Sequence, residues 1–176
     1  MKKILQFIKN FYLPAAIILT LAFSRIIPHP WNFTPILAAG TFLGFYFRQS
    51  LFLSMVMVIL PMFFGDIYFG FHNTMLFTYS ALIFTTLVGK YIKSLSTSKV
   101  FIGSIISSLG FFIITNFGVW ATSNMYSKNF QGLIEAYILG IPFLQNTFFS
   151  TFIYLFLFKI LYVISKNKII KQHHVA

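Results

Sequence analysis

The chemistry available to this sequence depends on few side chains, because charged residues make up only 9% of its 176 residues. Polar and aromatic residues that suit small-molecule recognition gather in three segments, 25–34, 65–73 and 116–137. Such side chains orient a ligand by hydrogen bonds and by stacking on its rings. Ionisable groups near membrane depth are costly and usually serve a ligand or a partner. We therefore predict substrate-binding residues, which are Arg25, Asn32, Asp66, His72, Asn116, Trp120, Glu135 and Asn146.

These residues also admit structural explanations. Tryptophan and tyrosine form belts at both interfaces of membrane proteins. Arg25 can form an ion pair with Asp66 or Glu135, the two acidic residues of the sequence, and so tie loops together. The residue types alone leave open whether this group is a ligand site or a structural ion pair.

Sequence signatures of catalysis and of metal binding are absent. The chain has no GxxxxGK[ST], HExxH or GxSxG motif, so it hydrolyses no nucleotide by itself. The absence of cysteine excludes disulfides and thiol chemistry. His29, His72, Asp66 and Glu135 lack a spacing typical of metal ligands. We predict that the protein is not an enzyme and holds no cofactor or metal.

The elements that position these residues must be membrane helices. The sequence is 58% hydrophobic, and its 9% of charged residues compares with about 25% in soluble domains. The net charge of +11 is spread in short clusters between apolar runs, which is typical of membrane proteins and not of nucleic-acid binders. We predict one all-α, polytopic domain over residues 1–176, in contact with membrane lipid and with no nucleic-acid partner.

Six apolar runs are the predicted transmembrane helices, at about 11–27, 34–47, 51–70, 73–89, 100–121 and 139–164. The second is short, since 14 residues rise only about 21 Å. It must borrow from residues 30–33, lie obliquely or be re-entrant. The first run is not a cleavable signal peptide, because it leads into Arg25 and Pro28 and not into a small-residue cleavage site.

The basic residues predict the orientation. With six spans, the termini and the 48–50 and 90–99 segments share one side, and that side holds 11 of the 13 lysines and arginines. The opposite side holds only Arg25 and Lys128. Because basic residues favour the cytoplasmic side, both termini are predicted to be cytoplasmic.

Two sets of small or polar residues recur at helical spacing. Ala16, Thr20 and Ser24 repeat every fourth residue in the first span, which lets another helix approach closely. That helix can belong to this chain or to a separate subunit. In the fifth span Ser104 and Ser108 begin a stripe that continues to Thr115, and it either faces a cavity or packs against a helix.

Three blocks of sequence carry a resemblance to a known family. They are RIIPHPWNFTPILAAGTFLG (25–44), FFGDIYFGFHNTMLFTYSALIFTTLVGK (63–90), and TNFGVW (115–120) with GLIEAYILGIPFLQNTFFST (132–151). Together they cover about half of the chain. The sequence resembles the DUF6580 family of small bacterial membrane proteins, which are regarded as transport proteins.

The general architecture is similar to the substrate-binding (S) components of energy-coupling-factor (ECF) vitamin transporters. Those proteins have six helices, both termini inside, and a pocket toward the outside. They dock on a transmembrane subunit through small residues of the first helix, an arrangement that Ala16, Thr20 and Ser24 resemble. The similarity is one of overall architecture.

The resemblance implies a multi-pass protein of the bacterial inner (plasma) membrane. It would bind a vitamin-like or cofactor-precursor-like molecule from the outer side. A separate transmembrane coupling subunit and ATPases would supply the energy. Two alternatives stay open: a membrane scaffold or assembly subunit that transports nothing, and a stand-alone secondary transporter. The latter would need inverted repeats or broken helices, and the sequence shows no repeat.

Overall fold

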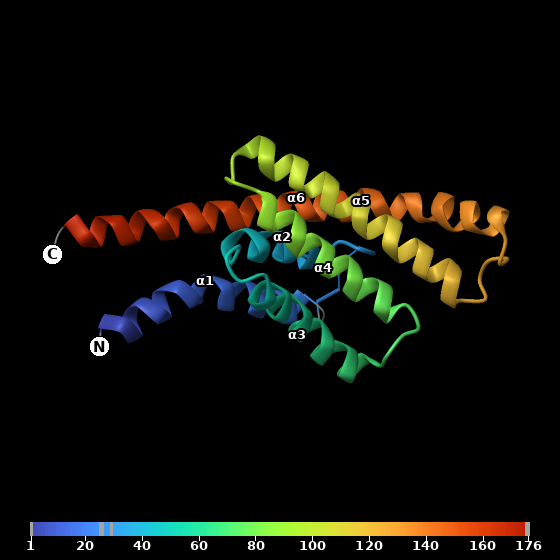
Figure 1. Cartoon of the computed structure of the whole chain (residues 1–176), viewed down its shortest axis with the longest axis horizontal. Helices are drawn as coiled ribbons and strands as arrows, with labels where there is room; N and C mark the ends of the chain where they lie inside the picture. Colours follow the sequence, from blue (N-terminus) through green and yellow to red (C-terminus); the bar gives the residue numbers. More distant parts are fainter. Residues whose placement is uncertain (1, 25–26, 29, 175–176) are drawn as a thin grey trace.

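A computed structural model gives the structure of the chain and describes residues 2–24, 27–28 and 30–174 (Figure 1). This part of the chain is all-helical, as the sequence predicts. Its six helices are α1 (Lys2–Ser24), α2 (Ile36–Tyr46), α3 (Leu51–Phe69), α4 (Met75–Tyr91), α5 (Thr97–Thr122) and α6 (Phe130–His174).

Three of the helices in the described part are long and apolar enough to cross a membrane. They are α3, α5 and the Phe130–Asn167 part of α6. Large apolar side chains such as Phe52, Phe64 and Phe149 lie exposed on α3 and α6. Faces of this kind suit lipid and indicate a membrane protein. The full count of six spans stays a prediction.

Helix α2 lies at the centre of the bundle. Every residue from Leu37 to Gly44 is buried, and α2 contacts each of the other five helices. Its 11 residues rise only roughly 16 Å, against a hydrocarbon core of about 30 Å. Because protein surrounds α2, its backbone ends need not face lipid. The short second run, predicted as a span at 34–47, is therefore a buried central helix.

Helices α2 and α4 approach each other closely through glycine. A Cβ atom built on Gly44 would lie 2.1 Å from the carbonyl oxygen of Thr86. One built on Gly89 would lie 1.9 Å from the carbonyl oxygen of Thr41. Only glycine permits this backbone contact, and such crossings are typical of membrane helices that pack on small residues.

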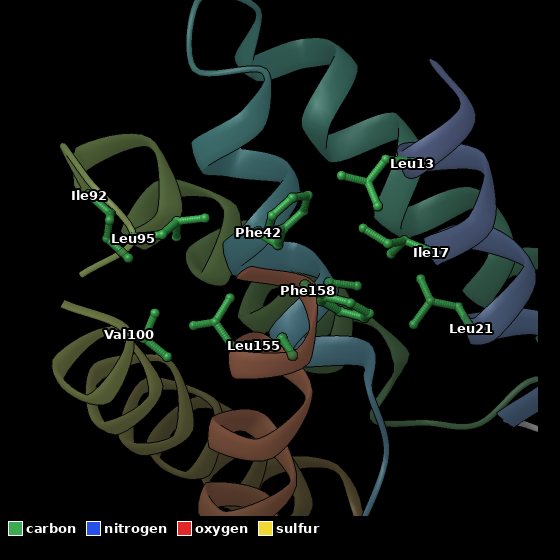
Figure 2. Close-up of a cluster of buried hydrophobic side chains, with 11 residues drawn as sticks. Leu13, Ile17, Leu21, Phe42, Ile92, Leu95, Val100, Leu155 and Phe158 are labelled. Carbon is green, nitrogen blue, oxygen red and sulfur yellow. The ribbon is translucent and has the colours of Figure 1, made fainter. Parts of the chain in front are cut away.

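A hydrophobic cluster joins α1, α2, α5, α6 and the α4–α5 connector (Figure 2). In Figure 2 the side chains of Phe42 and Phe158 lie between a row on α1 and a group around Val100. The α1 row consists of Leu13, Ile17 and Leu21, which recur every fourth residue and are all buried. Helix α1 therefore packs against the bundle through the face that carries these three residues, and its exposed residues lie on the opposite face.

Hydroxyl groups link the helices inside the bundle. The Thr41 and Ser107 hydroxyls lie 2.8 Å apart and connect α2 with α5. The Ser54 hydroxyl donates to the backbone carbonyl of Leu43 at 3.1 Å and connects α3 with α2. Buried hydrogen bonds of this type hold helices together where lipid removes the hydrophobic driving force.

Helix α6 is much longer than the predicted span at 139–164. Its 45 residues extend roughly 67 Å at about 1.5 Å per residue, so it extends past the predicted span at both ends. In Figure 1 the last turns of α6 and the first turns of α1 project at the same end of the bundle. Which side of the membrane this end faces stays a prediction.

Candidate functional site

A cavity of about 340 Å³ lies where α1 and α3 end and where α2 and α4 begin. This is the end of the bundle that is predicted to face outward, and we call it the outer cavity. Its volume lies at the lower end of the range of small-molecule sites, about 300–1,000 Å³. The lining is mostly apolar with three hydroxyl groups, and consists of Leu21, Ser24, Thr34, Ile36, Met62, Phe69, Thr78, Leu82 and Phe111.

Two hydroxyls of the outer cavity already donate to their own helices. The Ser24 hydroxyl donates to the carbonyl of Leu21 at 2.8 Å. The Thr78 hydroxyl donates to the carbonyl of Thr74 at 3.2 Å. A hydroxyl that has given its proton still offers lone pairs. These side chains therefore offer acceptors, and a bound molecule would match them with N–H or O–H groups.

A buried carboxylate lies beside the outer cavity. Asp66 is only 1% exposed, and the Tyr79 hydroxyl donates to its Oδ2 at 2.6 Å. Met62 and Phe69 lie one turn before and after Asp66, on the same face of α3, and both line the cavity. Tyr79 directly follows the cavity residue Thr78. The carboxylate and phenol thus form a polar pair next to the cavity wall.

The connector from α1 to α2 is held by one face of α6. The Asn146 amide nitrogen donates to the carbonyl of Trp31 at 3.1 Å. The Ser150 hydroxyl donates to the carbonyl of Asn32 at 3.4 Å, and the Tyr154 ring lies 6.1 Å from the ring of Phe33. Residues 146, 150 and 154 recur every fourth position and so share a face. Asn146, a predicted substrate ligand, thus has a contact that positions the connector.

Asn32 takes part in the connector through its backbone. Its φ of 59° lies in the left-handed region, which asparagine tolerates better than most residues. Its side chain is exposed. Arg25 and His29 lie outside the described residues, and the predicted pairing of Arg25 with Asp66 or Glu135 stays a prediction.

The remaining predicted residues lie apart from the lining of the outer cavity. The Asn116 amide donates to the carbonyl of Phe112 at 2.8 Å. The Trp120 indole donates to the carbonyl of Ser127 at 3.0 Å, and the ammonium of Lys128 lies 5.9 Å from the centre of the Trp120 ring. These contacts of Trp120 tie the end of α5 to the α5–α6 connector.

His72 and Glu135 are exposed and make local contacts. The Nδ1 atom of His72 lies 2.9 Å from the Thr74 hydroxyl. The Gln131 amide lies 3.4 Å from the Glu135 carboxylate, one turn away on α6. Among the described residues, no three His, Asp or Glu side chains lie together as metal ligands would.

The small-residue face of α1 borders a second hollow. Ala16 and Thr20 are exposed, so no helix of the described chain covers them. Thr20 and Ser24 line a groove of about 340 Å³ beside Phe33 and Tyr154. Ser24 thus lines both the outer cavity and this groove. Docking of a separate subunit at this face stays a prediction.

Sequence reasoning missed three residues at or beside the outer cavity. Thr34, Thr78 and Tyr79 are ordinary residues of apolar helices or turns, and no motif marks them. Helical periodicity gives one signal for Thr78. It lies one turn before the buried Leu82, so both residues share the inward face of α4. In the fifth-span stripe, Ser104 and Ser108 are buried in the bundle, whereas Phe111 reaches the cavity.

The comparisons with known proteins concern the family alone. No curated protein and no solved structure matches the chain. A family model described as a family of unknown function, DUF6580, matches residues 5–173. Because the match spans almost the whole sequence, the chain belongs to the DUF6580 family.

Proposed function

We propose that this protein binds a small molecule in the outer cavity from the outer side of the bacterial inner membrane, as the substrate-binding component of an energised uptake system. The observation that supports this function best is the outer cavity itself. It collects side chains from five helices and the α1–α2 connector, and it combines an apolar wall with a few hydroxyls. Small-molecule sites in membrane bundles have this composition.

The lining suggests the chemistry of the ligand. An apolar or aromatic body would fit against Leu21, Met62 and Phe111. One or two N–H or O–H groups would pair with the lone pairs of Ser24 and Thr78. A vitamin-like or cofactor-precursor-like molecule has this combination of a ring and donor groups.

The energy for uptake would come from other chains. The sequence has no nucleotide-binding motif, so a transmembrane coupling subunit and ATPases would drive release on the cytoplasmic side. The exposed Ala16 and Thr20 of α1 would offer such a subunit a close approach.

The test is native mass spectrometry of the purified full chain, which detects a retained small molecule, followed by titration with that molecule. Thr78→Val removes a cavity hydroxyl while keeping the side-chain volume, and we expect binding to weaken about five- to tenfold, as for one lost hydrogen bond of about 1 kcal/mol. Thr122→Val is the matched control, because Thr122 also donates to a carbonyl of its own helix but lies far from the cavity lining. Equal effects of the two variants would contradict binding in the outer cavity.

A further inference from the structure

A further pocket, distinct from the outer cavity and from the groove beside α1, lies at the opposite end of the bundle, on the predicted cytoplasmic side. Its volume is about 690 Å³. The end of α2, the α4–α5 connector and α6 all contribute to it. We call it the inner basic pocket, and it is defined here by Phe45, Tyr46, Arg48, Lys93, Tyr162 and Lys166.

The cations of the inner basic pocket have no acidic side chain of this protein to pair with. Arg48, Lys93 and Lys166 come from three separate segments and line one pocket. The sequence has two acidic side chains. Asp66 is buried beside the outer cavity, and Glu135 lies on the first turns of α6 at the other end. Three like charges that line one hollow repel each other, so an anion from outside the chain would stabilise them.

Aromatic rings form the apolar part of the inner basic pocket. The ring of Tyr162 lies 5.7 Å from that of Phe45 and 6.0 Å from that of Tyr46, in edge-to-face arrangements. Tyr162 and Lys166 are one turn apart, so they share a face of α6. Tyrosine and lysine side chains together are typical of the level where lipid headgroups lie.

An apolar groove adjoins the inner basic pocket. It runs between α4 and α5, has a volume of about 690 Å³ and is lined by side chains such as Leu87, Val88 and Ile106. Its two cations are Lys93 and Lys99, and Lys93 also lines the inner basic pocket. A basic pocket that continues into an apolar groove matches a molecule with a phosphate at one end and a hydrocarbon chain at the other. A free phosphate or an acidic peptide would leave the groove unused.

We propose that the inner basic pocket binds the phosphate headgroup of an anionic phospholipid, with an acyl chain in the α4–α5 groove. Basic pockets between the cytoplasmic ends of membrane helices bind such headgroups. The bound lipid would add a contact between the end of α2, the segment after α4 and helix α6, all of which line this pocket. This site is independent of the outer cavity, and so is its test.

The test is native mass spectrometry of the full chain in a zwitterionic detergent, titrated with phosphatidylglycerol or with phosphatidylcholine of the same acyl chains. We expect the wild-type chain to prefer phosphatidylglycerol. The triple variant Arg48→Gln, Lys93→Gln, Lys166→Gln is expected to lose about fivefold in affinity for each charge removed. The control variant Lys90→Gln, Lys128→Gln, Lys159→Gln removes the same net charge from positions that line neither the inner basic pocket nor the α4–α5 groove, and it is expected to keep the preference.

Three outcomes would overturn the proposal. The first is an equal loss in the control variant, which would mean general attraction to a basic surface. The second is displacement of the lipid by inorganic phosphate at equal concentration, which would mean a site for free phosphate. The third is unchanged affinity in the triple variant, which would assign the cations to another anion, such as an acidic partner protein. If the triple variant does not fold, the lipid affinities of the single variants Lys93→Gln and Lys93→Arg are compared instead. Only Lys93→Gln removes the charge, so only this variant is expected to bind the lipid more weakly.

Discussion

A hydrogen bond from the next helix helps to keep a carboxylate inside this apolar bundle. Asp66 is almost fully buried and accepts a hydrogen bond of 2.6 Å from the Tyr79 hydroxyl. This length lies within the usual range of O–H···O hydrogen bonds. A buried carboxylate without such donors would cost several kcal/mol. The contact also joins α3 to α4 directly beside the outer cavity.

Removal of the Tyr79 hydroxyl tests this contact. Tyr79→Phe should lower the free energy of unfolding by about 1–2 kcal/mol, as for hydrogen bonds between membrane helices or to charged groups. The measurement is thermal or denaturant unfolding in detergent. Tyr68→Phe is the control, because Tyr68 is 83% exposed. A Tyr79→Phe protein as stable as the control would show that Asp66 does not depend on this donor.

For single residues, the sequence predicts that Asp66 is important, but it does not predict which side chain donates a hydrogen bond to it. An aspartate between apolar runs must be buried or lie at an interface, and this much follows from composition. Its partner Tyr79 is 13 residues away on the next helix, and only the rotation of α4 about its axis brings the two together. Asn146 shows the reverse case, since the residue was predicted as a ligand and its amide contacts the backbone of Trp31.

The close crossing of α2 and α4 is the main constraint at the scale of elements. Gly44→Ala would place a methyl group against the backbone of Thr86. Because backbone cannot move aside as a flexible side chain can, we expect a loss of about 1–3 kcal/mol, as for overpacked cores. Unfolding in detergent measures it. Ala121→Ser adds one atom at an exposed position of α5 and should be neutral. Equal stability of the two variants would contradict the crossing.

The hydroxyl pair of Thr41 and Ser107 permits a quantitative test of the contact between α2 and α5. We expect a double-mutant cycle with Thr41→Val and Ser107→Ala to give a coupling energy of about 0.6 kcal/mol, the average for hydrogen bonds between membrane helices. The same unfolding assay provides the four free energies. Strict additivity would indicate that the 2.8 Å contact contributes nothing.

Element boundaries were predictable to different degrees. The run at 51–70 and the helix Leu51–Phe69 nearly coincide, because Ser50 precedes the run and Gly70 ends it with a positive φ. The run at 34–47 looked like an inadequate span, because the sequence cannot show that five other helices surround it. For α6, apolar content marked the middle of the helix and gave no sign of its polar extension beyond residue 164.

At the scale of the whole molecule, the orientation is open to a direct test. The sequence contains no cysteine, so single cysteines can be added as labels at the exposed Ser98 and Ser127. A maleimide that cannot cross membranes should react with Ser127→Cys in intact cells, and with Ser98→Cys only after lysis. The opposite pattern would invert the predicted orientation and place the outer cavity on the cytoplasmic side.

The class of the molecule follows from the sequence more readily than its site does. Composition predicted an all-helical membrane protein, and the sequence blocks predicted the family, because both depend on patterns along the chain. The outer cavity depends on how the ends of four helices meet, and its hydroxyls at Thr34 and Thr78 look like any others in the sequence. The residues predicted for ligand binding were chosen for polarity, whereas most of the cavity wall is apolar.

The hold of α6 on the α1–α2 connector has a mechanical consequence. The connector supplies Thr34 to the wall of the outer cavity, and Asn146, Ser150 and Tyr154 fasten it to α6. Beyond Tyr154 the same helix continues toward the opposite end of the bundle, where Tyr162 and Lys166 line the inner basic pocket. Helix α6 therefore contacts both the connector that borders the outer cavity and the inner basic pocket. A displacement of α6 at one of these sites would be transmitted along the helix to the other.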